Sequence, residues 1–135
     1  MRRANLCVLL GLGVAVIAAS AAADGIGGSQ PLVCDLVEVS QCDPSAVCKD
    51  VTFAQIDLPP VFKVDFAASQ VVSEDGQRAS PIKSVETLPT VLIVHGHQED
   101  RGWTMVIDRA TGQLSATLAD LHGAFVIAGA CADAG

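Results

Sequence analysis

The sequence predicts an all-β fold, a small antiparallel meander closed or partly closed into a barrel, or else a two-layer sandwich. Three observations predict it. Beyond residue 51 the apolar residues recur mostly with a period of two, which is typical of strands with one buried face. Turn-forming residues separate these runs. Four cysteines lie beyond residue 23, three of them early and one close to the C-terminus, which predicts that disulfides stabilise the domain.

The first residues carry the features of a secretory signal. Arg2 and Arg3 precede an apolar run over 6–18, which is too short to span a membrane, and small residues follow it. Cleavage after Ala23 or after Ala21 would both suit a signal peptidase. A twin-arginine signal and a lipid anchor on Cys7 are weaker alternatives, since the flanking motif is missing and Cys7 lies before the apolar run. We therefore expect a signal peptide over 1–23, a flexible leader over 24–33 and a single β domain over 34–135, with no stable membrane anchor.

The four cysteines of the mature chain are expected to form disulfides, because export places them in an oxidising compartment. Three lie within fifteen residues and the fourth is close to the C-terminus. Among the three possible connectivities we favour Cys42–Cys48 together with Cys34–Cys131. The chain-entropy model gives a loop near a hundred residues about 4.7 kcal/mol of stabilisation. A zinc site is the rival interpretation, and the absence of a close Cys-x-x-Cys pair disfavours it.

Alternating apolar residues predict about seven or eight short strands. They fall around residues 62–66, 70–73, 79–85, 90–95, 103–107, 114–118 and 125–130. Asp75-Gly76 predicts a hairpin, and Pro81 predicts that the strand after it is at an edge or interrupted. The run 91–94 is continuously apolar, which favours a strand covered on both faces. Residues 43–47 could form one helical turn.

The segment from Trp103 to Leu118 carries the clearest hairpin pattern. The side chains of Trp103, Met105, Ile107, Leu114, Ala116 and Leu118 are expected on the buried side, and those of Thr104, Ser115 and Thr117 on the exposed side. Asp108 can accept turn N–H groups, and Gly112 can adopt positive φ. Trp103, the only tryptophan, is interpreted as a core anchor rather than an exposed binding platform.

The motif W…IDxxTGxL in this segment, the early cysteine cluster and the closing Gly-x-Cys resemble a group of small secreted bacterial proteins of unassigned function. The resemblance covers about the last quarter of the chain and the cysteine pattern, and it implies a fold and an export route rather than a chemistry. A looser similarity, of architecture alone, is to the small periplasmic β-barrel inhibitors of lysozyme.

His95 and His97 form the one constellation with evident chemistry. On a strand they share a face, so two imidazoles could bind one zinc or copper ion, with Glu99 or Asp100 as an oxygen ligand. The alternative is a strand end that runs into a solvated loop.

Catalytic patterns are sparse. There is no Gly-x-Ser-x-Gly elbow, and disulfides leave no free thiol in the mature chain. Asp57 and Asp65 could face each other across a hairpin, but exposed carboxylates also serve solubility in an acidic protein. Without residues 1–23 the chain has 6 basic and 15 acidic residues, which disfavours nucleic acid as a partner.

These observations lead to three functional hypotheses. The first is an exported, non-enzymatic binding or accessory protein that needs no cofactor, whose partner is an envelope or extracellular protein or a small ligand. The second is a metal-binding protein that uses His95 and His97. The third is a small hydrolase, which would need an apolar pocket with convergent polar groups.

Overall fold

The computed structural model describes residues 25–134, and nine strands make up its regular structure. The signal peptide predicted for residues 1–23 lies outside the described residues. The strands are β1 (Leu32–Cys42), β2 (Cys48–Val51), β3 (Val61–Asp65), β4 (Gln70–Ser73), β5 (Ala79–Thr87), β6 (Val91–Gln98), β7 (Arg101–Asp108), β8 (Gln113–Asp120) and β9 (Gly123–Asp133). The all-β prediction is confirmed.

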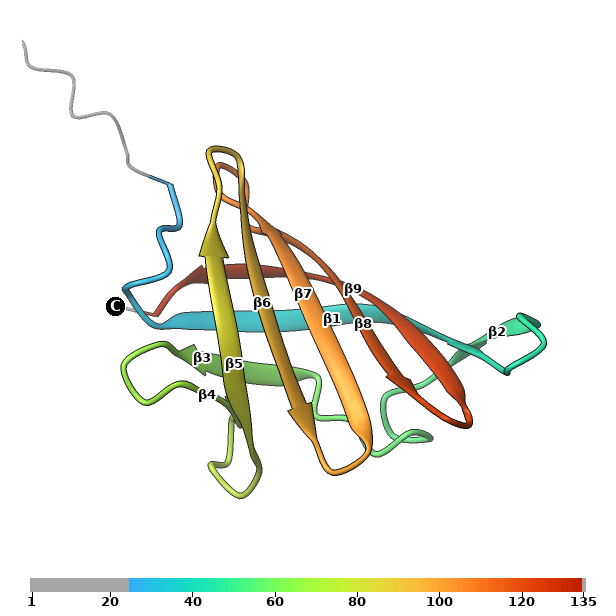
Figure 1. Cartoon of the computed structure of the whole chain (residues 1–135). Coiled ribbons are helices and arrows are strands. Elements are labelled where there is room, and N and C mark those ends of the chain that lie inside the picture. Colours follow the sequence, from blue (N-terminus) through green and yellow to red (C-terminus); the bar gives the residue numbers. More distant parts are fainter. Residues whose placement is uncertain (1–24, 135) are drawn as a thin grey trace, which may run out of the picture.

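All the strands pair antiparallel in a single sheet, in the order β2-β1-β3-β4-β5-β6-β7-β8-β9. An additional pairing of β1 with β9 closes eight of these strands into a barrel, and β2 extends from β1 as a separate hairpin (Figure 1). The structure thus favours the closed barrel over the sandwich. Closure leaves few strand edges exposed, which suits a small domain made of short strands.

The strand β1 is long enough to pair with three partners. Its first residues pair with β3, its last with β2, and its whole length with β9. A register shift against β9 falls between Leu36 and Glu38, and it leaves Val37 exposed. This bulge lets the strand bend around the barrel while Leu36 and Val39 both remain buried.

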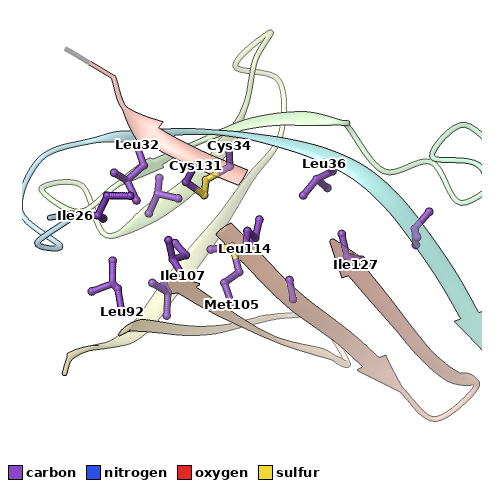
Figure 2. Packing of buried hydrophobic residues seen from close by; sticks show 14 residues of the cluster. Ile26, Leu32, Cys34, Leu36, Leu92, Met105, Ile107, Leu114, Ile127 and Cys131 are labelled. Carbon is purple, nitrogen blue, oxygen red and sulfur yellow. A yellow bond between two sulfur atoms is a disulfide. The ribbon is translucent and has the colours of Figure 1, made fainter. Parts of the chain in front are cut away.

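The buried apolar side chains of the strands come from β1, β3, β6, β7, β8 and β9, and partly buried side chains of β2, β4 and β5 pack against them. Leu32, Leu92, Ile107 and Leu114 are the largest of the fully buried side chains. Figure 2 shows them converging, with the Cys34–Cys131 disulfide beside Leu32. Both predicted disulfides are present: Cys34–Cys131 joins β1 to β9 at the barrel closure, and Cys42–Cys48 closes the β1–β2 hairpin.

One end of the barrel, called here the plugged end, is covered by the segment 25–28. Ile26 of this segment is buried in the core and lies near Leu32 and Leu92 (Figure 2). Its N–H donates to the carbonyl of Arg109 (2.9 Å), and Nε of Arg109 donates to the carbonyl of Ile26 (2.7 Å). Nη1 of Arg109 also donates to the carbonyl of Leu88 in the β5–β6 turn (2.8 Å). Residues 25–33 are therefore not simply a leader: Ile26 belongs to the core, and β1 begins at Leu32.

The predictions for individual strands and turns are confirmed in part. Pro81 lies in β5, which is interrupted by a register shift between Ile82 and Ser84 rather than being a free edge. The expectation that both faces of the 91–94 run are covered is wrong, because only Leu92 and Val94 point into the barrel and Ile93 remains half-exposed.

Residues 43–47 form the tip of the β1–β2 hairpin instead of a helical turn. Asp43 still accepts the N–H groups of Ser45 and Val47, as a turn-forming carboxylate does.

Candidate functional site

The opposite end of the barrel, called here the open end, contains a cavity of about 210 Å³. Three segments surround it: the loop 52–60, the β4–β5 turn and the β6–β7 turn, which lie together at the lower end of the barrel in Figure 1. The cavity is partly open to solvent. It is therefore the natural place for a small ligand to bind.

Apolar side chains form most of the cavity wall. They include Leu36, Leu58, Phe62, Met105, Leu118 and Ile127. Ala116 contributes a small side chain on β8, where a larger residue would occupy this space. The largest fully buried side chains, Leu32, Leu92, Ile107 and Leu114, lie with Ile26 toward the plugged end, so the barrel is filled there, whereas the cavity leaves the other end hollow.

Trp103 forms one wall of this cavity. It points to the inside of the barrel with Met105 and Ile107, as predicted, but it is only half-buried because it borders the cavity. Its indole lies against Gly96, the residue opposite it on β6, where any Cβ would overlap the ring. Nε1 donates to Oγ of Ser80 on β5 (2.8 Å). The indole is thus held in one orientation by a glycine and a hydrogen bond, and its position accounts for glycine at residue 96.

An ion pair fastens the loop 52–60 across the open end. Nη1 of Arg78 donates to the carbonyl of Asp57, and Nη2 donates to its carboxylate, each at 2.6 Å. Both side chains are largely exposed, so the pair contributes little to global stability. The expectation that Asp57 faces Asp65 across a hairpin is wrong: Asp57 lies in the loop, and Asp65 accepts the N–H of Ala68 in the β3–β4 turn.

A second hollow of about 350 Å³ lies beside the open end, between the β6–β7 and β8–β9 turns. It is larger, but its walls are mostly charged turn residues, and its apolar contribution is Leu121, which is 91% exposed. Such a surface does not enclose an apolar ligand. Arg101 borders both hollows.

His95 and His97 lie on the outer face of β6, because the residue between them pairs with the inward-facing Trp103. Nδ1 of His95 is 3.0 Å from Oγ1 of Thr104 on β7. Glu99 and Asp100 form the turn beyond β6. Within residues 25–134, no group of three or more His, Cys, Asp or Glu side chains is arranged to hold a metal ion.

The sequence interpretation missed this cavity. Its walls come from residues scattered over eight strands, a loop and a turn, so no local sequence motif reveals it. One signal was available in the sequence. Gly96 and Trp103 lie at matching positions on either side of the turn between β6 and β7, and this spacing predicts that the aromatic ring packs on the glycine. The sequence does not reveal the cavity that remains empty beside that ring.

No family model, curated protein or solved structure matches the chain. The two disulfides are consistent with an oxidising compartment. No helix capable of crossing a membrane is found in the part of the chain that the structure describes.

Proposed function

We propose that this protein is exported and acts as a non-enzymatic binding protein that takes a small apolar molecule into the open end of its barrel. The cavity beside Trp103 is the observation that carries this proposal. An apolar cavity of about 150 Å³ is known to hold benzene, so about 210 Å³ suits a single ring or a short chain. Ligand pockets for larger, drug-sized molecules are roughly 300–1,000 Å³.

Export is supported by the signal-like N-terminus, by the two disulfides, and by the resemblance of the cysteine pattern and the Trp103 hairpin to small secreted bacterial proteins. In an oxidising compartment the Cys34–Cys131 disulfide fixes the closure of the barrel. A rigid barrel with one hollow end is pre-organised for a ligand, because little conformational entropy remains to be lost on binding.

The binding of benzyl alcohol, a neutral single-ring probe, tests the proposal. Trp103 is the only tryptophan and lines the cavity, so its fluorescence should change during the titration and the melting temperature should rise. Ala116→Leu fills the cavity from β8 and should abolish both effects. Ser115→Leu, on the outer face of the same strand, is the matched control and should leave both unchanged. Equal binding by the two variants would show that the probe does not occupy the cavity.

The metal-binding alternative is supported only by the shared face of His95 and His97. Zinc or copper would raise the melting temperature of the protein if these side chains held an ion, and His97→Ala would remove that rise. Because no third His, Cys, Asp or Glu side chain is arranged beside this pair within residues 25–134, we expect no such rise.

A further inference from the structure

A polar pair lies at the mouth of the cavity and faces inward. Gln98 and Arg101 are opposite each other at the end of the β6–β7 hairpin, and both line the cavity. Each lies two residues from a member of the inward-facing Gly96–Trp103 pair, so both share the inner face of the barrel. Arg101 is therefore a charged residue at the start of β7, on a face whose other side chains, Trp103, Met105 and Ile107, are apolar.

The guanidinium of Arg101 makes few contacts with other described residues. Among the described residues its ion-pair partner is Asp120, with Nη2 3.5 Å from the carboxylate, and its Cζ lies 5.9 Å from the ring centre of Phe125. The same carboxylate of Asp120 accepts the N–H of His122 (2.7 Å), and this hydrogen bond lowers the pKa of Asp120. A guanidinium has five N–H donors, so most remain available to a molecule in the cavity.

Arg78, the second arginine at this mouth, differs in this respect. Two of its nitrogens already donate to Asp57 at 2.6 Å, which satisfies the fork that would bind a carboxylate. The same contacts occupy Asp57, and Asp120 already faces Arg101, so a cationic ligand would find no unengaged carboxylate on the cavity wall. The available polar groups are thus the donors of Arg101 and the amide of Gln98.

We propose that the ligand is a small organic anion, in which a compact apolar body fills the cavity beside Trp103 and a carboxylate binds Arg101 and Gln98. This inference rests on the proposed function and specifies its ligand class. A planar carboxylate matches the guanidinium fork, and the NH₂ of Gln98 supplies a further donor. The acidic charge of the rest of the chain does not draw anions to its surface, so recognition depends on the cavity and on Arg101 together.

Phenylacetate and phenylacetamide test this class, because they share a size and differ in charge. Calorimetric titration of the mature chain should show that phenylacetate binds about tenfold more tightly, the effect expected of one charge-assisted contact. Arg101→Gln should reduce the preference to within about twofold, chiefly by weakening the binding of phenylacetate. Arg101→Lys, which retains the charge but lacks the fork, should give an intermediate preference. Lys49→Gln, which removes one positive charge from an exposed position on β2 that does not line the cavity, is the matched control and should keep the full preference.

The outcomes separate this inference from the proposed function. If neither probe binds, the cavity is not a ligand site and the proposed function fails. If both bind equally, the cavity binds ligands but the anion inference is wrong. If Arg78→Gln removes the preference and Arg101→Gln does not, the carboxylate binds Arg78, and the assignment to Arg101 is wrong. Fluorescence of Trp103 and the melting temperature of each variant show whether a lost affinity comes from unfolding.

Discussion

Gly112 offers the sharpest test of how the turn between β7 and β8 packs against β9. Its φ is +79°, where a side chain is strained, and its carbonyl accepts the N–H of Cys131 (2.7 Å). A Cβ added here would lie 3.2 Å from the carbonyl carbon of Cys131 and closer still to its oxygen. Gly112→Ala therefore adds two penalties, one from the backbone conformation and one from a collision with β9.

Gly76, in the β4–β5 turn, separates these penalties. Its φ of +72° is nearly the same, but a Cβ there would meet no atom within 4 Å. Gly76→Ala should therefore cost only the strain of a left-handed residue, about 1 kcal/mol. At Gly112 the overlap should add about 1–3 kcal/mol, the usual penalty for overpacking, so the total is about 2–4 kcal/mol.

Urea unfolding of the oxidised, mature protein measures both costs, and thermal melts check them. At about 4 °C per kcal/mol for a domain of this size, the melting temperature should fall by about 4 °C for Gly76→Ala and about 8–16 °C for Gly112→Ala. Equal losses in the two variants would refute the reasoning, because the contact with Cys131 would then contribute nothing.

Three further predictions concern the disulfides, the turns and the plugged end. Replacing Cys34 and Cys131 by Ala should cost about 4–5 kcal/mol in urea unfolding, against about 2 kcal/mol for the short Cys42–Cys48 loop; the reverse order would contradict the loop-entropy argument. The N–H groups of Thr111 and Ala110 lower the pKa of Asp108 below its ordinary value of 3.8, so its stabilising effect is complete above that pH and is lost as the pH falls through the lowered value. The melting temperature should accordingly drop more steeply in acid for the wild type than for Asp108→Asn, and parallel curves would show that this carboxylate is not involved. Arg109→Met should cost about 2 kcal/mol by removing the donors to Ile26 and Leu88, with amide exchange of Ile26 rising most; an unchanged Ile26 exchange rate would show that Arg109 does not hold the segment.

The hairpin of β7 and β8 could be predicted from the sequence because its determinants are local. Period-two alternation sets which residues of both strands face inward, and Asp108 and Gly112 set the turn between them. The predicted antiparallel pairing, the buried side and the positive φ of Gly112 are all confirmed. The disulfide pairing was predicted for a similar reason, since a short loop and a terminal clasp were the simplest use of four cysteines.

The strand β1 was harder to predict because its alternation changes phase. The bulge after Leu36 moves the next buried residue from an even to an odd position, at Val39, so no single period runs through the strand. Ile26 was missed for another reason: it is one apolar residue among glycines, and its burial depends on Arg109, which is 83 residues away in the sequence. The cavity depends on what the core does not fill, and that follows from packing in three dimensions rather than from any pattern along the chain.

The two ends of the barrel are stabilised by different means, and this difference bears on ligand access. At the plugged end, Ile26, Arg109 and the Cys34–Cys131 disulfide join strands that lie far apart in the sequence. At the open end, the loop 52–60 is held by the exposed Arg78–Asp57 pair, which contributes about 0–1 kcal/mol, and by the partly buried side chains of Phe53, Ile56 and Leu58. No residue of this loop is fully buried, so we expect local opening to require less free energy at this end than at the plugged end. The proposed ligand would then reach Trp103 through movement of this loop, while the strands that close the barrel remain in place.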